Sequence, residues 1–447
     1  MTQCNAQIAL FSIGRRKVTI QSNGTFITSN AGVLLAGRIE KRLGLARRLS
    51  AVLRDRRDPD LITHTYEDQM RQRILQIVCG YEDGNDAKEL RLEPAFQTAM
   101  GRIAGEEESV LASQPTLSRF EQRAPYELLR MSEEMVDLWA ERLLAGGRKA
   151  WRDIVLEFDS TDDPTHGAQQ LSMFHGYYDQ YMYHPLVVFD GEGWPVAMVL
   201  RPGRAHASEA AASILLRIFE KIVERLPAKA RITFRADAGF AIPEIYELCE
   251  TMGIRYVIGQ ITHASYQERM SATLAEAQLQ YEEKGEKVRL FTEFEYQAET
   301  WNRPRRIIGK AEVMPEGPNV RCVVTNIDEL DAEKGYDYYT ERGQSENYIK
   351  DLKNAMFGDR LSCSSFHANQ FRLLLHTAAY IVMYELRQEM AETALAKAQL
   401  DTLRLKLMKI GACIVVTARR VWVQLSAFDP SRPLFEHACR RLAAAPI

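Results

Sequence analysis

The sequence predicts an α/β protein in which a mixed sheet lies between a helical N-terminal region and a helical C-terminal region. Helical periodicity dominates up to about residue 150, and apolar strand-like segments begin after it. Between residues 154 and 259 the expected order is three strands, a helix, a strand, a helix and a strand. From residue 290 to residue 326, apolar and polar residues alternate in three further segments, as in half-buried strands.

Composition places the chain among globular proteins with a sizeable core. It has 447 residues, enough for two or three domains, and 46% are apolar while 26% are charged. The longest apolar stretch, residues 371–386, contains Arg372, His376 and Glu385, so we expect a buried helix and no membrane span. A basic cluster follows the short apolar run at the N-terminus, the reverse of a secretory signal, which predicts a cytoplasmic location.

Cysteine and histidine are scattered along the chain. The seven cysteines include no Cys-x-x-Cys pair, and the nine histidines include no His-x-x-x-His pair. This pattern disfavours a disulfide framework and a structural zinc site. A bound metal is therefore expected to have oxygen ligands, which favours Mg²⁺, with Mn²⁺ as a substitute.

Residues 1–150 are predicted to be mainly helical after two short strands. The strands are expected at Ile8–Ile13 and Val18–Thr28, and the helices at Leu34–Leu53, Tyr66–Gly80 and Ser132–Leu144. Ser113 is a suitable N-cap for another helix, with Pro115 in its first turn and Arg119 exposed. An ordinary capped helix and a helix that contacts phosphates are both consistent with this pattern.

Positive charge is concentrated near the N-terminus. Residues 1–57 hold eleven Lys and Arg residues against two acidic residues, whereas the whole chain has a net charge of −3. A basic segment on an otherwise acidic protein is typical of binding to a polyanion, and Arg38, Lys41 and Arg42 are the candidates on the first helix. A solvated amphipathic helix explains the same charges equally well.

Residues 151–259 are predicted to form the first part of the core. The expected strands are Ile154–Phe158, Pro185–Phe189, Pro195–Leu200, Arg231–Ala236 and Arg255–Gly259, and the expected helices are Ser208–Leu226 and Pro243–Met252. A glycine-containing turn at residues 190–193 predicts that the second and third strands form a hairpin. An antiparallel hairpin followed by parallel strands is the order of an RNase H-like core.

Two aspartates directly follow strands of this core. Asp159 comes after the first strand and Asp237 after the fourth, and functional carboxylates of such sheets lie at strand ends. Asp162 and Asp163 follow in a Thr-Asp-Asp-Pro sequence typical of a turn, so we rank them as turn or supporting residues. For Asp237, capping of the next helix is the alternative explanation.

Residues 260–335 are predicted to form a β subdomain inserted into the core. Its strands are expected at Leu290–Trp301, Arg305–Val313 and Val320–Asn326. Trp301 is followed by three arginines within five residues, and an aromatic ring beside such charges suits stacking on an unpaired base. A tryptophan packed in the core of the subdomain is at least as consistent with the sequence.

A helix of unusual composition is predicted to complete the core. Tyr339, Arg342, Glu346 and Lys353 occur at offsets of 0, 3, 7 and 14 residues. At about 100° per residue their side chains fall within a sector of roughly 60°, and Lys350 shares that face. One carboxylate is then surrounded by groups that bind phosphate. A salt-bridged surface helix is the alternative explanation.

The remaining segments are predicted to be mainly helical. Residues 336–395 contain this helix and a long apolar helix at Asn369–Glu385. Residues 396–447 contain a helix at Leu400–Lys409 and a strand at Ile414–Val423, and dimerisation is the role that we consider for this region.

Asp159, Asp237 and Glu346 together suit one kind of chemistry. Three carboxylates from distant parts of a chain can bind two divalent cations about 3.5 to 4 Å apart, which hold the attacking and leaving oxygens of a phosphoryl transfer. This chemistry needs no cysteine, activated serine or histidine base, so the scattered Cys and His residues agree with it.

These motifs resemble those of cut-and-paste DDE transposases of bacterial insertion sequences. The Tyr-x2-Arg-x3-Glu-x6-Lys signature of that superfamily matches the four residues from Tyr339 to Lys353. Wider similarity, from about residue 30 to about residue 390, is to the insertion-sequence family numbered 1380. It includes the segments Asp159–Gly167, Tyr177–Asp190, Arg235–Phe240, Tyr256–Gly259 and Arg342–Asn347.

The resemblance implies a Mg²⁺-dependent transposase with an RNase H-like catalytic core, a DNA-binding N-terminal region and a homodimeric complex on DNA. Such an enzyme binds terminal inverted repeats, cleaves the ends and joins the 3′ hydroxyl to target DNA, here in association with the bacterial nucleoid. Asp159, Asp237 and Glu346 take the catalytic positions, and Trp301 is the candidate for base stacking by location. An RNase H-like nuclease without strand transfer and an inert DNA-binding repressor are the alternatives.

Overall fold

The computed structural model describes residues 8–13, 15–20 and 26–444, and the chain folds as two compact units. The central unit consists of Glu121–Thr377, and the terminal unit combines Met1–Phe120 with Ala378–Ile447. The predicted boundaries near residues 150, 260, 335 and 395 therefore differ from this division, which separates the chain after residues 120 and 377.

The terminal unit is mainly helical. Its helices are α1 (Val33–Leu43), α2 (Leu45–Ala51), α3 (Tyr66–Val78), α4 (Ala87–Leu90), α5 (Pro94–Ala99), α6 (Gln114–Phe120), α15 (Leu400–Leu403) and α16 (Arg432–Ala444). Gly44 adopts a left-handed conformation with φ of 66°, so the single helix predicted at Leu34–Leu53 is divided into α1 and α2. A capping box of Thr65 and Asp68 starts α3 at its predicted position.

The strands of the terminal unit come from both ends of the chain. β3 (Phe26–Thr28) pairs with β15 (Ala412–Val416), which pairs with β16 (Val421–Leu425) in an antiparallel sheet. The single strand predicted at Ile414–Val423 is therefore a hairpin, whose turn is closed by a bond from Thr417 N to the Arg420 carbonyl. A second hairpin consists of β1 (Ile8–Ile13) and β2 (Arg16–Ile20). Residues 21–25 of the predicted strand Val18–Thr28 lie outside the described residues.

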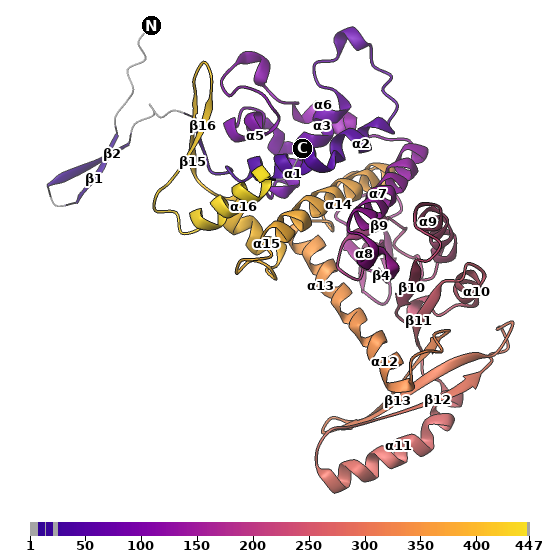
Figure 1. Ribbon diagram of the computed structural model, residues 1–447. Helices are drawn as coiled ribbons and strands as arrows, with labels where there is room; N and C mark the ends of the chain where they lie inside the picture. Colours follow the sequence, from indigo (N-terminus) through magenta and orange to yellow (C-terminus); the bar gives the residue numbers. More distant parts are fainter. Residues whose placement is uncertain (1–7, 14, 21–25, 445–447) are drawn as a thin grey trace. The chain divides into compact units, whose positions relative to one another are not determined.

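The central unit is built on an eight-stranded mixed sheet with the order β12-β13-β14-β11-β10-β4-β8-β9 (Figure 1). The strands are β4 (Asp153–Ser160), β8 (Leu186–Asp190), β9 (Pro195–Val199), β10 (Arg231–Ala236), β11 (Arg255–Gln260), β12 (Val288–Tyr296), β13 (Arg305–Met314) and β14 (Gly317–Thr325). β10 runs parallel to β4 and to β11, whereas β8 runs antiparallel to β4 and to β9. The predicted mixed sheet, with a hairpin followed by parallel strands, is thus confirmed.

The strands of the predicted insertion extend this sheet and do not form a separate one. β14 pairs antiparallel with β11, with Thr325 opposite Val257, and β13 and β12 follow beyond β14. The strands of the predicted inserted β subdomain therefore continue the central sheet. Pairing with β11 satisfies the backbone groups at an edge of the parallel part of the sheet, which an isolated insertion would leave open.

A helix that the sequence did not predict lies between β11 and β12. α11 (Ala264–Lys284) packs along β12 and β13 (Figure 1). Only Tyr266, Met270 and Ala277 of this helix are buried, a stripe too narrow to produce clear apolar periodicity. Gly309 of β13 makes room for the helix, because a side-chain carbon at this position would lie 2.1 Å from Met270 Sδ.

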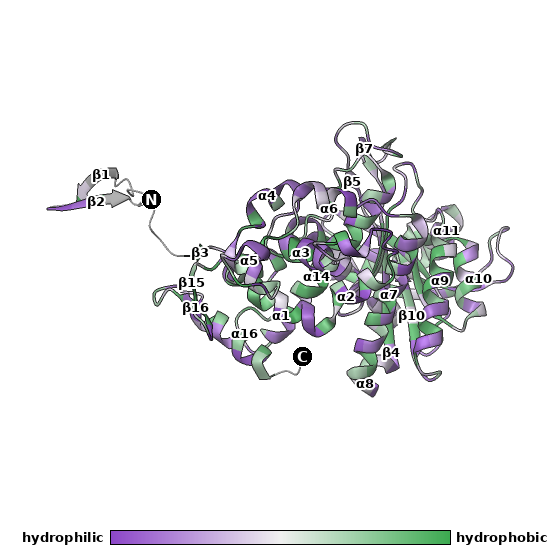
Figure 2. Cartoon of the chain, turned by 90° about the horizontal axis from the view of Figure 1, so that it is seen from above, coloured by the Kyte–Doolittle hydropathy of each residue, from purple (hydrophilic) through white to green (hydrophobic). Residues whose placement is uncertain are grey.

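Amphipathic helices cover the central sheet. They are α7 (Pro125–Ala145), α9 (Ala211–Arg225) and α10 (Pro243–Thr251), and the short α8 (Arg148–Arg152), which has no buried residue, leads into β4. Figure 2 shows both polar and apolar residues in α9 and α10, as expected for helices with one face on a sheet. α7 begins seven residues before the predicted start at Ser132, and its Trp139 donates a 2.9 Å hydrogen bond to Asp190 at the end of β8.

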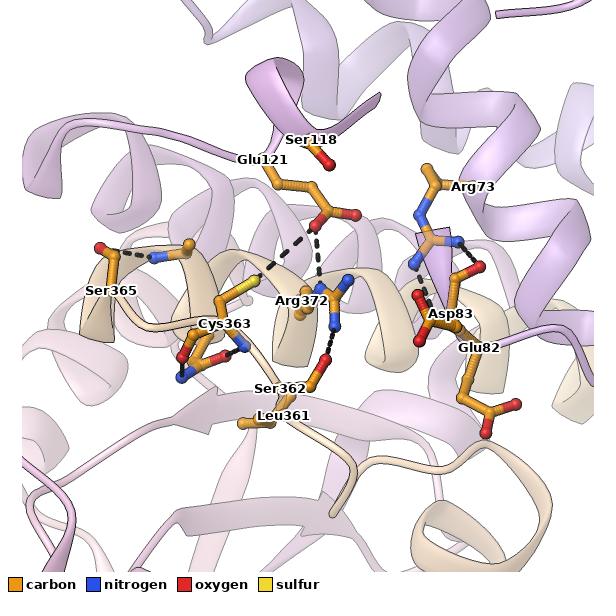
Figure 3. Close-up of polar contacts among 12 residues, drawn as sticks. Arg73, Glu82, Asp83, Ser118, Glu121, Leu361, Ser362, Cys363, Ser365 and Arg372 are labelled. Atoms are coloured by element: carbon orange, nitrogen blue, oxygen red, sulfur yellow. Dashed lines mark hydrogen bonds and ion pairs between the residues drawn. The ribbon is translucent and has the colours of Figure 1, made fainter. Parts of the chain in front are cut away.

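The long apolar helix predicted at Asn369–Glu385 is confirmed as α14 (Phe366–Glu389). In the central unit, Arg372 Nε donates a 2.8 Å hydrogen bond to Glu121, and its Nη1 donates a 2.6 Å bond to Ser362 (Figure 3). This ion pair lets the buried helix accommodate an arginine. No helix within the described ranges, α14 included, combines the length and the apolarity that crossing a membrane requires.

Candidate active site

The two candidate aspartates lie at the ends of adjacent parallel strands. Asp159 is the penultimate residue of β4, and Asp237 directly follows β10. Phe158 of β4 is opposite Ala236 of β10 in the register, so the residues that follow each of them, the two aspartates, come side by side. Asp237 Oδ1 also accepts a 2.9 Å hydrogen bond from Gly239 N and caps a short 3-10 turn, η4 (Ala238–Phe240). Asp237 therefore caps this turn, as the alternative explanation expects, and also lies beside Asp159.

Asp159 lies in a network that neutralises its charge. Its Oδ2 accepts a 2.9 Å bond from Arg342 Nη1 and a 3.2 Å bond from Ser345 Oγ, and its Oδ1 accepts a bond from Ser160 N. Burial raises the pKa of the Asp159 carboxyl to about 6, against the effect of Arg342, and the negative charge of Asp237 adds to the rise. The two aspartates therefore interact electrostatically, and Arg342 compensates for part of their repulsion.

The signature segment is not one continuous α-helix. It consists of α12 (Ala332–Thr340), the 3-10 turn η5 (Glu341–Gly343), α13 (Gln344–Lys350) and the π-helix η6 (Asp351–Ala355). Because 3-10 and π turns advance by different angles from an α-helix, the calculated 60° sector does not hold across it. The position of each signature side chain therefore has to be taken from its own contacts.

Tyr339 and Arg342 lie against the sheet near the aspartates. A side-chain carbon on Gly259 of β11 would lie 2.5 Å from Tyr339 Oη, so glycine permits this close approach. Burial opposes the charge of Arg342, but Asp159, Tyr339 and Asp237 raise the pKa of the guanidinium above its usual value. These two signature residues are thus brought to the candidate site.

Lys353 is attached to the turn that follows β4. Its Nζ donates to Asp162 Oδ1 at 2.8 Å, to the Asp162 carbonyl at 2.9 Å and to Thr161 Oγ1 at 3.3 Å. Burial alone would raise the pKa of Asp162, but the contact with Lys353 lowers it. Asp162 therefore anchors the signature lysine, a role that the composition of the turn did not reveal.

Glu346 is not brought together with the two aspartates. Its side chain is exposed, and it makes no hydrogen bond or ion pair to any other described residue. Within the described ranges, no three His, Cys, Asp or Glu residues gather closely enough to hold a metal ion. Lys350 is exposed as well. Two of the three predicted carboxylates are thus side by side, while Glu346 lies apart from them. Arg342 donates a hydrogen bond to one oxygen of Asp159.

A buried arginine ties the signature segment to the sheet. Arg235 of β10 pairs with Glu157 of β4, and its Nη1 donates a 2.9 Å bond to Glu341 and a shorter bond to the Tyr338 carbonyl. The side chains of Arg235 and Glu157 are 4% and 1% exposed, so this pair lies inside the protein. An arginine within the apolar strand sequence Ile-Thr-Phe-Arg-Ala was the available signal for this residue.

Trp301 is a core residue of the extended sheet. It is 8% exposed and packs edge-on against Tyr246 and Tyr296, with ring centroids 5.4 and 5.7 Å apart. The nearby arginines are also paired, Arg303 and Arg305 with Glu250 and Arg306 with Glu293. Trp301 is thus packed as the structural alternative expects, and its stacking on a base stays a prediction.

The basic residues of α1 have different environments. Arg42 pairs with Glu389 at 2.6 Å and with Glu385 at 3.3 Å, both on α14 within the terminal unit. Arg38 Nη2 lies 3.5 Å from the Leu442 carbonyl. These two arginines therefore contribute to the fold of the unit. Lys41 of α1 is exposed, and so is Arg119 of α6.

A separate cavity lies away from the carboxylates. It has a volume of about 340 Å³ and is lined by α7, β9, α9 and the start of α14, largely by apolar side chains. None of the three candidate carboxylates lines it. Because the candidate catalytic carboxylates lie outside this cavity, we place the candidate site at the strand ends.

Fold and site together define a mixed α/β protein with a carboxylate centre at the ends of adjacent parallel strands. The family model for the transposase DDE domain group 1 matches residues 11–447, and the chain belongs to this family. It is therefore a DDE transposase, a member of a class of DNA-cleaving and strand-transferring enzymes that use divalent metal ions. The structure is similar to piggyBac transposase in a synaptic complex with hairpin DNA, with a TM-score of 0.42 and 10% identity over 84% of this chain and 80% of that one. No curated protein matches the sequence.

Proposed function

We propose that this protein is a cut-and-paste transposase of a bacterial insertion sequence of the family numbered 1380. It binds the terminal inverted repeats, cleaves both ends by two-metal phosphoryl transfer and joins the freed 3′ hydroxyl to target DNA. The observation that carries the proposal is the pair Asp159 and Asp237 on adjacent parallel strands, with Arg342 of the signature bonded to Asp159.

The order of the core strands supports an RNase H-like arrangement. Numbered along the chain, β4, β8, β9, β10 and β11 are strands one to five, and in the sheet they have the order three, two, one, four, five. The first strand is then central and carries Asp159, while the fourth strand beside it leads into Asp237. The segment from α11 to β14 interrupts the sequence between the fifth strand and the helix with Glu346.

The donor set at this site fits a divalent cation. Asp159 and Asp237 offer carboxylate oxygens of the hard type that Mg²⁺ prefers, and Glu346 is exposed and unpartnered among the described residues. These three residues would hold Mg²⁺ or Mn²⁺, which when bound polarises the phosphate and activates the attacking oxygen. Asp159 Oδ2 becomes available only when Arg342 turns away, and the arginine can then donate two hydrogen bonds to a phosphate.

Glu346 has to approach the aspartates for the proposed site to be complete. α13 is only seven residues long and lies between a 3-10 turn and a π-helix. Such irregular turns occur frequently at functional sites and allow a short helix to rotate between them. Ser345 already bonds to Asp159, so the residue before Glu346 is held at the site.

The proposed reaction requires double-stranded DNA and a homodimer. Two transposon ends have to be cut together, so we infer two copies of the chain in the complex with inverted repeats and target DNA. The bacterial cytoplasm, with its nucleoid, is the proposed location. Exposed Lys41, Lys350 and Arg119 are the predicted DNA contacts that make no internal ion pair among the described residues.

One reconstituted reaction distinguishes the proposal from its alternatives. Purified protein is incubated with Mg²⁺, a supercoiled target plasmid and a DNA fragment bounded by the inverted repeats that flank its gene. We expect end cleavage and insertion, and we expect Asp159→Asn to abolish both while Glu283→Gln, an exposed control on α11, retains them. Cleavage without insertion would instead indicate a nuclease, and end binding without cleavage would indicate a repressor.

A further inference from the structure

Two histidines, nine residues apart in the sequence, meet at a small sheet of the central unit. This sheet has the order β5 (Asp163–Pro164), β7 (Gln180–Tyr183) and β6 (Met173–His175), and β5 and β7 are labelled in Figure 2. His175 is the last residue of β6, whereas His184 directly follows β7. Because β6 and β7 form a hairpin, the two rings come into contact, with centroids 5.2 Å apart and planes at 66°.

Each of these two rings has a buried nitrogen without a hydrogen-bond partner. The atoms are His175 Nδ1 and His184 Nε2, and neither makes a hydrogen bond to any part of the chain that the structure describes. His184 as a whole is only 4% exposed. Buried polar atoms in folded proteins almost always have a partner. Two such nitrogens in contacting rings therefore indicate a ligand that both rings share.

Backbone groups fix the position and the tautomer of His184. Its Nδ1 lies 2.7 Å from the Ala205 carbonyl oxygen, and since a carbonyl only accepts, Nδ1 carries the hydrogen. The His184 backbone N–H donates to the Arg201 carbonyl, and the His184 carbonyl accepts a 3.0 Å bond from Arg201 Nε. Burial lowers the pKa of His184 to about 4, so the ring is neutral at pH 7 and Nε2 keeps its lone pair. One ring nitrogen bonded to a carbonyl, with the other left as a lone pair, is typical of a histidine that binds a metal ion.

The separation of the two rings agrees with one shared metal ion. At metal–nitrogen distances of about 2.0 to 2.1 Å and a tetrahedral angle, two imidazole ligands have centroids roughly 5 Å apart. The observed separation of 5.2 Å matches this value. An edge-to-face contact between two neutral rings has a similar separation, but it leaves both buried nitrogens without a partner.

The groups around the two histidines favour a metal ion that binds nitrogen. The ring of Tyr178 packs against both, with its centroid 5.1 Å from that of His175 and 5.9 Å from that of His184. Burial raises the pKa of Tyr178, and three aspartates, Asp162 foremost, raise it further, so the phenol is neutral and the local potential is negative. At His184 the Arg201 guanidinium opposes this attraction for a cation. Binding therefore has to come mainly from the nitrogen lone pairs.

We propose that His175 and His184 bind one divalent transition-metal ion of the Zn²⁺ type. Imidazole nitrogen binds Zn²⁺, Cu²⁺ and Ni²⁺ well, whereas Mg²⁺ prefers oxygen, so this site differs in chemistry from the carboxylates at the strand ends. Water completes the coordination, because the protein supplies two ligands and not the four of a structural zinc site. A bound ion links the hairpin of β6 and β7 to the loop that holds His184. Neither histidine takes part in the proposed phosphoryl transfer, so the site goes beyond the proposed function.

Titration with Zn²⁺ tests the site. The full chain is purified without a histidine tag, freed of metal by a chelator and titrated in a calorimeter in excess Mg²⁺, which competes for the carboxylates. We expect Zn²⁺ to bind and to raise the melting temperature, because it stabilises only the folded state. Electron paramagnetic resonance of the chain with one equivalent of Cu²⁺ should show coupling to imidazole nitrogen.

Three variants locate the bound ion. His175→Phe keeps a ring in the contact, and His184→Asn keeps a donor for the Ala205 carbonyl, but each removes one unpartnered nitrogen. Both should bind Zn²⁺ at least about tenfold more weakly and lose the rise in melting temperature. His166→Phe replaces an exposed histidine of the same region and should behave like the wild type.

The proposal is overturned if His175→Phe binds Zn²⁺ as tightly as the wild type, or if His166→Phe weakens binding to the same degree. It is also overturned if the wild-type chain binds no Zn²⁺ in excess Mg²⁺, and the two nitrogens are then satisfied by water. Circular dichroism of the metal-free variants checks their folding. His175→Phe decides if His184→Asn does not fold, because the His175 side chain is only partly buried.

Discussion

The two strand-end aspartates and the segment that carries Glu346 are held in different ways. Asp159 and Asp237 belong to adjacent strands whose register places them together. Glu346 lies on a seven-residue helix between a 3-10 turn and a π-helix. Its side chain makes no hydrogen bond or ion pair with the described residues. We infer that the sheet provides a fixed half of the site and that α13 provides an adjustable half, so that assembly can depend on ligand binding.

The largest expected effect is the loss of end cleavage when one of the candidate carboxylates is replaced. Glu346→Gln should reduce end cleavage by about 10⁴-fold, as removal of a catalytic group commonly does, without changing the melting temperature, because the side chain is exposed and unpartnered among the described residues. Asp237→Ala should lose activity to the same degree and also about 1 kcal/mol of stability, because Asp237 caps η4. Cleavage assays and thermal unfolding of both variants make this comparison, and equal stability losses would contradict it.

The attachment of the signature segment to the sheet can be broken at Arg235. Arg235→Leu leaves Glu157 buried without its partner and releases Glu341 of η5, so we expect a loss of about 3 kcal/mol in the free energy of unfolding. Arg231→Leu is the matched control, because this arginine begins the same strand and its ion pair with Asp153 is half exposed. Urea unfolding measures both, and similar losses would show that burial of the pair is unimportant.

The turn after β4 should give the protein a pH dependence. Burial raises the pKa of Asp163 well above its usual value of 3.8, and Asp359 adds to this rise. The folded state then binds a proton that the unfolded state releases, so this residue lowers the free energy of unfolding as pH rises above about 3.8. Asp163→Asn should therefore be more stable than the wild type at pH 8 and lose this advantage near pH 4.

Asp162 is a control for that measurement, because its pKa is lowered and its effect on stability should change with pH in the opposite direction. Lys353 lowers its pKa, so the carboxylate stabilises the fold at neutral pH and loses this contribution as the solution becomes acidic. Asp162→Asn should be less stable than the wild type at pH 8, and the difference should shrink towards low pH. Unfolding curves at several pH values test both variants, and a parallel response of the two would refute the assignment.

The smallest expected effect concerns the second anchor of the signature segment. Lys353→Met removes three hydrogen bonds to the turn after β4 and should cost about 1 to 2 kcal/mol. Lys334→Met removes an ion pair with Asp331 that is largely exposed, and it should have little effect. If the two lysines proved equivalent in thermal unfolding, Lys353 would not be an anchor in solution.

Most of the central sheet was predictable because its strands are short apolar runs with clear ends. β10 was predicted at its observed bounds, and the hairpin of β8 and β9 followed from a turn with glycines. α11 was missed because only three of its residues are buried. The pairing of β14 with β11 was missed because a strand sequence does not specify which edge it joins.

The sequence by itself determined the positions of Asp159 and Asp237 after their strands and the spacing of the four signature residues. Only the tertiary structure decided what these residues contact. Helical spacing predicts a common face only when the helix is regular, and η5 and η6 interrupt it, so Arg342 reaches Asp159 while Glu346 remains exposed. Burial likewise depends on packing between distant segments, which is why Trp301, beside three arginines, lies in the core while Tyr177 and Tyr181 are exposed.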